Sequence, residues 1–153
     1  MCLIIEKGTN KRKAKADILV YKCLDENNGS YFTPFQHFHV FFEDGKCVLK
    51  VKHFSFKKIK NETVVETGIH SYYNKWFAHD IVVRFHELHG TEKHCAIIPK
   101  GASYYIGYYG EIVSNELIVF ETEQDYKEYV KTSEKICTFF AGNLIKVLDC
   151  VPK

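Results

Sequence analysis

Alternation of apolar and polar residues dominates the first half of the chain. This period of two is typical of half-buried β-strands, and residue types that favour strands, such as Val, Ile, Phe and Tyr, occupy many of the positions. The predicted strands cover residues 2–6 (CLIIE), 17–24 (DILVYKCL), 33–42 (TPFQHFHVFF), 47–56 (CVLKVKHFSF) and 61–68 (NETVVETG).

Two of the breaks between these strands have the composition of tight turns. Residues 25–30 (DENNGS) centre on Asn-Asn-Gly, and residues 43–46 (EDGK) centre on Asp-Gly. Because Asn, Asp and Gly tolerate positive φ, these segments predict turns, and the second predicts a two-residue hairpin. Residues 7–15 (KGTNKRKAK) are polar and basic, which predicts a loop or arm.

From Tyr73 the apolar period changes to that of a helix, and Gly90 is the predicted stop. The apolar residues that carry this period are Trp76, Phe77, Ile81, Phe85 and Leu88. Strands are predicted at residues 94–99 and 116–121, followed by a short acidic helix capped by Thr122 with Asp125. Residues 133–148 (SEKICTFFAGNLIKVL) predict a final helix inside a helical extension of residues 132–153.

These elements predict an α+β protein in which one domain covers residues 1–153. The sheet is expected to be mostly antiparallel, with one central helix and C-terminal helices. The chain has 153 residues, of which 46% are hydrophobic and 15% aromatic, enough for a sizeable core. No linker divides it and no repeat is present.

The net charge and the cysteine spacing limit the partners and the cellular environment expected for the protein. The formal net charge is +2, so no strong nucleic-acid signal is present, although residues 46–60 are locally rich in lysine. No apolar run has the length of a membrane span, and the N-terminal segment is unlike a signal peptide. The six cysteines lack CxxC spacing and are expected to be free thiols in a reducing cytoplasm.

Residues 96–121 (AIIPKGASYYIGYYGEIVSNELIVFE) combine aromatic rings with glycines. One interpretation is a hairpin whose tyrosines cover an edge of the core. The other is a wall of a binding site, where rings stack on a flat group while Lys and backbone amides hold a phosphate. The candidate ligand-binding residues in this segment are Lys100, Ser103, Tyr104, Tyr105, Tyr108 and Tyr109.

A second candidate block, residues 68–76 (GIHSYYNKW), lies where a strand is expected to give way to the helix. A helix N-terminus attracts anions through its free N–H groups. Ser71 and Asn74 are candidate caps, and His70 is a candidate phosphate ligand or acid–base group, with Tyr72 beside it. A simple capped helix start is the structural alternative.

Residues 86–95 (HELHGTEKHC) raise the question of a metal site. His86 and His89 share a helix face, and His94 follows after a turn. The spacing matches no standard zinc site, so a solvated helix end is the favoured interpretation and His86, His89 and His94 are a weak metal alternative. No cofactor is predicted.

Several of these blocks, in this order, resemble a family of small proteins of tailed bacteriophages and prophages, many of them of the gut Bacteroidales type. The blocks are DILVYKCL, TPFQ, GIHSY, IIPKGASYY and GEIVSNELI, and they cover roughly residues 17–121. The family shares G[FIL]HS and IPKGxxYYxGxxGEIVSN motifs. The resemblance implies a phage origin and the cytoplasm of a bacterial host, and it implies no activity.

A weaker resemblance is to the ADP-ribosyltransferase-like fold. It would assign the early basic role to Lys22 or His70, the middle motif to Ser71 and Tyr72, and the catalytic carboxylate to Glu116. The chain departs from that pattern, because Lys stands where those enzymes have Arg or His and no glutamate pair precedes the late strand.

The favoured hypothesis is a binding protein that catalyses no reaction. Stacking and anion-binding candidates are numerous, whereas no nucleophile or acid–base pair is marked. The resemblance directs this hypothesis to sequestering a nucleotide-derived host immune signal, of the cyclic-nucleotide or ADP-ribose type. The alternatives are an enzyme that uses His70 and Glu116 on such a ligand, and a protein inhibitor of a host factor. A second copy of the chain is a further candidate partner.

Overall fold

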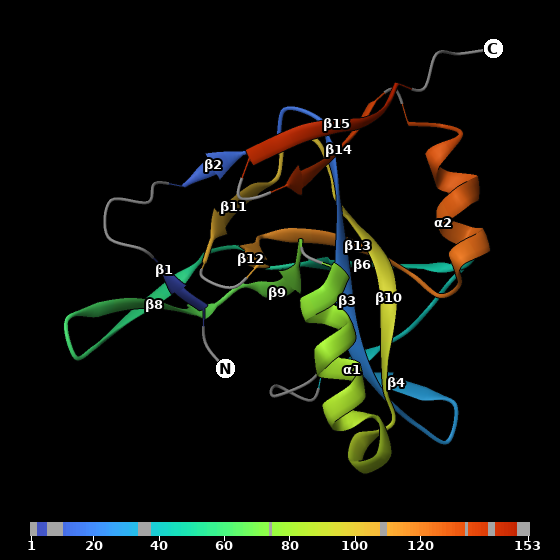
Figure 1. The fold of residues 1–153 in the computed structure, drawn as a ribbon, viewed down its shortest axis with the longest axis horizontal. Coiled ribbons are helices and arrows are strands. Elements are labelled where there is room, and N and C mark those ends of the chain that lie inside the picture. The colour runs from blue at the N-terminus through green and yellow to red at the C-terminus, as the bar shows by residue number, and fades with distance from the viewer. Residues whose placement is uncertain are drawn as a thin grey trace.

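The protein is a curled, mostly antiparallel β-sheet with a helix layer on one face and a smaller sheet beside it (Figure 1). The computed structural model describes residues 3–5, 11–33, 38–73, 75–107, 110–133, 135–140 and 143–149. The large sheet runs β2-β11-β12-β9-β3-β10-β13-β6, with β4, β5, β14 and β15 attached to it through β3 or to one another, and the small sheet runs β1-β8-β7. The α+β architecture predicted from the sequence is confirmed.

The strands are short, apart from the central β3 and its neighbour β10. The helices are α1 (Lys75–His89) and α2 (Glu123–Val130). The strands are β1 (Leu3–Ile5), β2 (Arg12–Lys13), β3 (Asp17–Asn27), β4 (Ser30–Phe32), β5 (His39–Val40), β6 (Lys46–Lys50), β7 (Ser55–Ile59), β8 (Glu62–Thr67), β9 (Ile69–Tyr72), β10 (Thr91–Ile98), β11 (Ser103–Ile106), β12 (Glu111–Ser114), β13 (Glu116–Phe120), β14 (Lys135–Phe140) and β15 (Asn143–Asp149).

The two faces of the large sheet bury different clusters. Alternation along β3 places Ile18, Val20 and Leu24 in the main core, which the curled sheet closes around itself. The opposite face carries the helices. Cys23 donates its thiol to the carbonyl of Ala78 in α1 at 3.7 Å, and rings of α2 pack on β13. Figure 1 shows α1 lying along β3 and β10.

Glycine and asparagine fix the turns as predicted. The β3–β4 turn has Asn28 at φ 52° and Gly29 at φ 82°, and the turn before β6 has Asp44 at φ 53° and Gly45 at φ 78°. Positive φ at both central residues defines the hairpin turn that suits the right-handed twist of strands. Gly90, at φ 63°, ends α1 as predicted.

Asp17 joins three elements at the start of β3. Its Oδ1 accepts from the backbone N–H of Lys100 at 2.9 Å. Its Oδ2 accepts from the hydroxyls of Tyr129 at 3.2 Å and Ser133 at 2.8 Å. The turn before β11, the helix α2 and the segment before β14 therefore depend on one carboxyl group.

The predicted cap of the acidic helix is confirmed, and Thr122→Ala tests its contribution. Asp125 N–H donates to Thr122 Oγ1 at 3.2 Å, and Thr122 N–H donates to Asp125 Oδ2 at 3.0 Å, which completes a capping box. Thr122→Ala is expected to lower the free energy of unfolding by about 1 kcal/mol, measured by urea denaturation. Thr122→Ser should retain most of that stability. Equal losses of unfolding free energy in Thr122→Ala and Thr122→Ser would contradict the capping role of the hydroxyl.

The final helix predicted for residues 133–148, within the helical extension of residues 132–153, is wrong. Lys135–Phe140 forms β14 and Asn143–Asp149 forms β15, an antiparallel pair. The cause is a non-local pairing, because β14 also runs parallel to β3, with Ile136 opposite Asp17 and Cys137 opposite Ile18. Ile136 and Cys137 are both buried there.

Other boundaries also differ from those predicted. The strand expected over residues 47–56 is broken after Lys50, because the chain leaves the large sheet there and joins the small one at Ser55. The basic segment of residues 7–15 contains a short strand, β2, paired with β11. In the strand expected over residues 33–42, β5 accounts for His39–Val40, and residues 34–37 lie outside the described residues.

Candidate functional site

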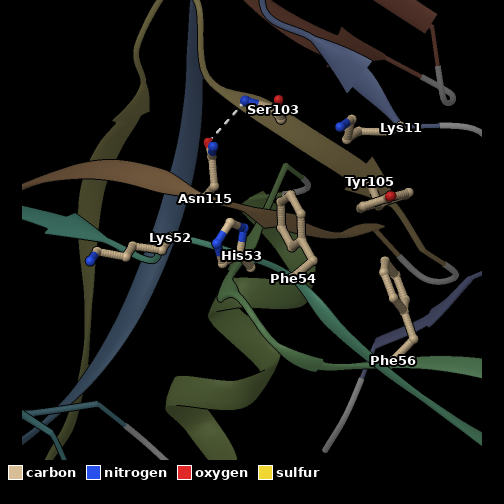
Figure 2. A pocket seen from close by; sticks show the side chains of 8 residues that line it. All are labelled: Lys11, Lys52, His53, Phe54, Phe56, Ser103, Tyr105 and Asn115. Carbon is tan, nitrogen blue, oxygen red and sulfur yellow. Dashed lines mark hydrogen bonds between the residues drawn. The ribbon is translucent and has the colours of Figure 1, made fainter.

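A groove opens where the large and small sheets meet (Figure 2). Its volume is about 230 Å³. The lining residues come from four parts of the chain that are distant in sequence: Lys11; Lys52, His53, Phe54 and Phe56; Ser103 and Tyr105; and Asn115. Since the connection between β6 and β7 crosses from one sheet to the other, it brings its side chains against β11.

Aromatic rings form the apolar wall of the groove. The ring of Tyr105 meets Phe54 edge to face at a centroid distance of 5.1 Å and Phe56 at 5.6 Å. Beneath the first pair lie the buried side chains of Val65 and Val113. Phe56 remains 47% exposed, so part of this aromatic surface is open to a ligand.

Backbone packing behind the wall is close. A Cβ on Gly68 would collide with Val113 Cγ2 and come within 3.3 Å of the Phe54 ring. A residue without a side chain is therefore needed where β8 passes into β9. This close approach holds the small sheet against β12 and fixes the position of Phe54.

The polar part of the groove is built on the turn between β12 and β13. Asn115 Oδ1 accepts from the backbone N–H of Ser103 at 2.9 Å, and Asn115 N–H donates to the Ser103 carbonyl at 3.0 Å. Figure 2 shows the hydrogen bond from the Ser103 backbone N–H to the Asn115 side-chain oxygen at the upper edge of the groove. Both side chains can offer hydrogen bonds to a ligand.

Basic side chains surround the groove. Lys11 lies beside Tyr105, while His53 lies beside Phe54 and Lys52 extends outward from the same segment (Figure 2). All three side chains are exposed. The described lining residues include no carboxylate, so an anion meets attraction without a neighbouring repulsive charge.

The residues predicted within residues 100–109 are divided by the structure. Ser103 and Tyr105 line the groove. Tyr104 points to the other face, where it is buried in the main core and forms a hydrogen bond with Arg12. Lys100 is exposed in the turn before β11 and is not among the lining residues. Tyr108 and Tyr109 lie outside the described residues.

The block of His70, Ser71 and Tyr72 forms strand β9, two strands away from β11. Ser71 lies inside the strand and is buried, so its predicted role as a helix cap is wrong; Asn74 lies outside the described residues. Burial, and then the charge of Lys22, lower the pKa of His70 to about 4. Burial, and then Glu111, raise the pKa of Tyr72. None of the three lines the groove.

The pair proposed for an enzyme, His70 and Glu116, is separated in its contacts. Glu116 forms an ion pair with Lys50 across β13 and β6 at 3.5 Å. His70 is opposite Val113 on β12. No contact joins the two side chains among the interactions of the described residues, so the structure gives no support for joint acid–base work.

The weak metal alternative is not supported by the described residues. His94 is buried on the core face, where its Nδ1 lies 2.9 Å from the carbonyl of Phe120 and its ring contacts Tyr31 and Phe42. His86 is exposed on α1, which packs on the opposite face of the sheet. Within the described residues no group of three potential ligands gathers, and the His89 side chain lies outside them.

Sequence reasoning missed much of the groove. The missed lining residues are Lys11, Lys52, His53, Phe54, Phe56 and Asn115. A partial signal existed, because two segments with a basic bias, residues 7–15 and 46–60, contain five of them. Nothing local in the sequence indicates that these segments meet at β11.

Comparisons with known proteins add no further identification. No protein-family model matches the chain, and neither the curated proteins nor the solved structures gave a significant match. Among the described residues, no helix has the length and apolar character that crossing a membrane requires. The four cysteines that the structure describes, Cys23, Cys47, Cys95 and Cys137, are free thiols.

Proposed function

We propose that the protein binds a nucleotide-derived ligand in the groove between β11 and the β6–β7 connection, without catalysing a reaction on it. The observation that carries the proposal is the convergence of basic side chains and an aromatic wall in one groove. Lys11 and His53 flank the rings of Tyr105 and Phe54, and no carboxylate is among the described lining residues.

The chemistry of the lining suits both halves of a nucleotide. A base is flat and stacks on an aromatic ring, which Tyr105 and Phe56 expose. A phosphate accepts charge-assisted hydrogen bonds from lysine, and Ser103 and Asn115 can hold a sugar or base edge. The hydrogen bonds and ion pairs of the described lining residues include no nucleophile–base or acid–base pair, which favours binding over catalysis.

The biological role proposed rests on the resemblance to tailed-phage proteins. In such a setting, a binding protein acts by lowering the free concentration of its ligand. We propose that the ligand is a nucleotide-derived host immune signal, of the cyclic-nucleotide or ADP-ribose type, and that sequestering it counters host defence.

A thermal-shift screen tests the binding proposal. The panel contains cyclic dinucleotides, cyclic oligonucleotides, NAD and ADP-ribose derivatives, since a ligand that prefers the folded state raises the melting temperature. Each ligand that stabilises the protein is released by denaturation and analysed by chromatography. Recovery of intact ligand is the predicted result. Recovery of an altered ligand would establish an enzyme, and a panel without stabilisation would contradict the proposal.

Tyr105 variants test whether the aromatic wall holds the ligand. Tyr105→Leu keeps apolar contact with Phe54 but removes the stacking face, and it is expected to weaken binding of a stabilising nucleotide about tenfold, measured by calorimetry. Tyr105→Phe keeps the ring and should bind within about twofold of the wild type. If Tyr105→Leu binds as tightly as Tyr105→Phe, the ligand lies elsewhere.

A further inference from the structure

The cationic side of the groove continues along β2. Lys13 is opposite Ser103, and Ser103 lines the groove. Directly opposed residues of an antiparallel pair project to the same face of the sheet. Lys13 therefore lies on the groove face, although it is not itself a lining residue.

Alternation along this segment separates Arg12 from the two lysines. Arg12 is opposite Tyr104 and bonds to it, which places Arg12 on the other face of the sheet from the groove, although its own side chain is exposed. Lys11, which directly precedes β2, and Lys13 are both exposed, and residues two apart in extended backbone lie about 7 Å apart on one face. This spacing is comparable with that of successive phosphates in a nucleotide chain.

The aromatic wall offers an open surface rather than a slot. Tyr105 meets both Phe54 and Phe56 edge to face, at 5.1 and 5.6 Å between centroids, so no base fits between these rings. A base can stack only on their outer face, where Phe56 is 47% exposed. A ligand held in this way can extend beyond one nucleotide without a steric barrier at the rings.

We propose that the groove recognises phosphodiester-linked nucleotides through two successive phosphates, one at Lys11 and the next at Lys13, with one base on the Tyr105–Phe56 surface. The inference rests on the proposed function and narrows its ligand class from nucleotides in general to linked nucleotides. A cyclic dinucleotide and a short linear strand share this chemistry.

The experiment compares three probes by calorimetry at one salt concentration: a nucleoside monophosphate, a linear dinucleotide with a 5′-phosphate, and a cyclic dinucleotide. At least one of the two linked probes is expected to bind about tenfold more tightly than the monophosphate, because it makes a second charge-assisted phosphate contact. Whichever linked probe binds more tightly identifies the source of the ligand as linear or cyclic.

Lys13→Gln separates the second contact from the first. It is expected to reduce the affinity for the tighter linked probe about tenfold and to leave the affinity for the monophosphate unchanged. The matched control is Lys127→Gln, an exposed lysine on α2, which lies on the side of the molecule away from β2 (Figure 1). The slope of log affinity against log salt concentration for the linked probe should also become less steep, by about 0.7.

Three results would overturn the inference, and they differ in whether they also overturn the proposed function. If the monophosphate binds as tightly as both linked probes, or if Lys13→Gln leaves linked-probe binding unchanged, the two-phosphate site is wrong and the proposed function stands. If none of the three probes binds, and the nucleotides of the thermal-shift panel also fail to bind, the proposed function fails together with the inference.

Discussion

Replacing Gly90 with alanine is expected to lower the free energy of unfolding by about 3 kcal/mol. Gly90 ends α1 at φ 63°, a conformation that costs an L-residue about 1–2 kcal/mol. In addition, an added Cβ would lie 2.5 Å from the carbonyl oxygen of Glu26, which is backbone and cannot rotate away.

The second part of this cost arises from the contact between the helix end and β3. Glu26 N–H donates to the Gly90 carbonyl at 3.1 Å, and Gly90 N–H donates to the backbone carbonyl of His86 at 2.8 Å. Moving the chain to relieve the collision would stretch the bond from Glu26. The reduced entropy of the unfolded chain offsets less than about 1 kcal/mol of the total.

Gly29→Ala is the matched control, measured by the same urea denaturation. Gly29 is at φ 82°, and no atom lies within 4 Å of the place where a Cβ would stand. Its substitution carries the conformational cost alone, about 1 kcal/mol. Equal losses for the Gly29 and Gly90 variants would contradict the predicted collision with Glu26.

A rise in stability between pH 8 and pH 10.5 is expected from Lys22, measured against Lys22→Met. Lys22 is 6% exposed, and its Nζ donates to the carbonyl of His70 at 2.6 Å. Burial lowers the pKa of Lys22 from 10.5 to about 8. The buried ammonium is therefore a source of instability at neutral pH.

The direction of the effect follows from which state holds the proton. Below pH 8 the amine is charged in both the folded and the unfolded chain, and the cost of burying the charge is complete. Between pH 8 and 10.5 the unfolded chain keeps a proton that the folded chain has released, so the free energy of unfolding rises with pH. The shift corresponds to about 3 kcal/mol.

The comparison with Lys22→Met removes other titrations. Cys23, whose pKa burial raises to about 11 against the lowering effect of the Lys22 charge, acts in the opposite direction above pH 9. It is present in both proteins, and because its folded pKa lies above pH 10.5, the folded thiol stays mostly protonated in each over the measured range. Loss of the hydrogen bond to His70 changes the variant's free energy of unfolding by an amount that does not depend on pH. The difference in unfolding free energy, wild type minus variant, should therefore increase from pH 7.5 to 10.5. A constant difference would mean that Lys22 keeps an ordinary pKa.

Local chemistry was sufficient to predict several elements of the fold. Asn28-Gly29 and Asp44-Gly45 specify their turns by tolerating positive φ, and Gly90 specifies the end of α1 in the same way. Thr122 and Asp125 specify the start of α2 through a bond between neighbours in sequence. Each of these signals lies within a few residues of the feature that it determines.

The C-terminal hairpin shows where local reasoning fails. The apolar residues of residues 133–148 fit a helix or a strand, and the choice depends on the parallel pairing of Ile136 and Cys137 with the start of β3. That partner is more than a hundred residues earlier in the chain. Long-range pairing overrides local preference, and periodicity does not reveal it.

The candidate site was predicted in part for the same reason. Rings and polar groups cluster in the segment of Ser103 and Tyr105, and this local signal points to both. The same cluster contains Tyr104, but alternation along the strand turns Tyr104 into the core. Lys52 and His53 belong to the site because the chain changes sheets between β6 and β7. A change of sheet leaves no mark in a single sequence.

The most direct test of nucleotide binding in the groove is to map the site by NMR. Amide shifts are recorded while a nucleotide that stabilises the protein is added. Binding in the groove predicts that the largest changes occur at Ser103, Tyr105, Asn115 and the connection from Lys52 to Phe54. Changes centred on His70–Tyr72, with the groove unaffected, would contradict it and move the site to β9.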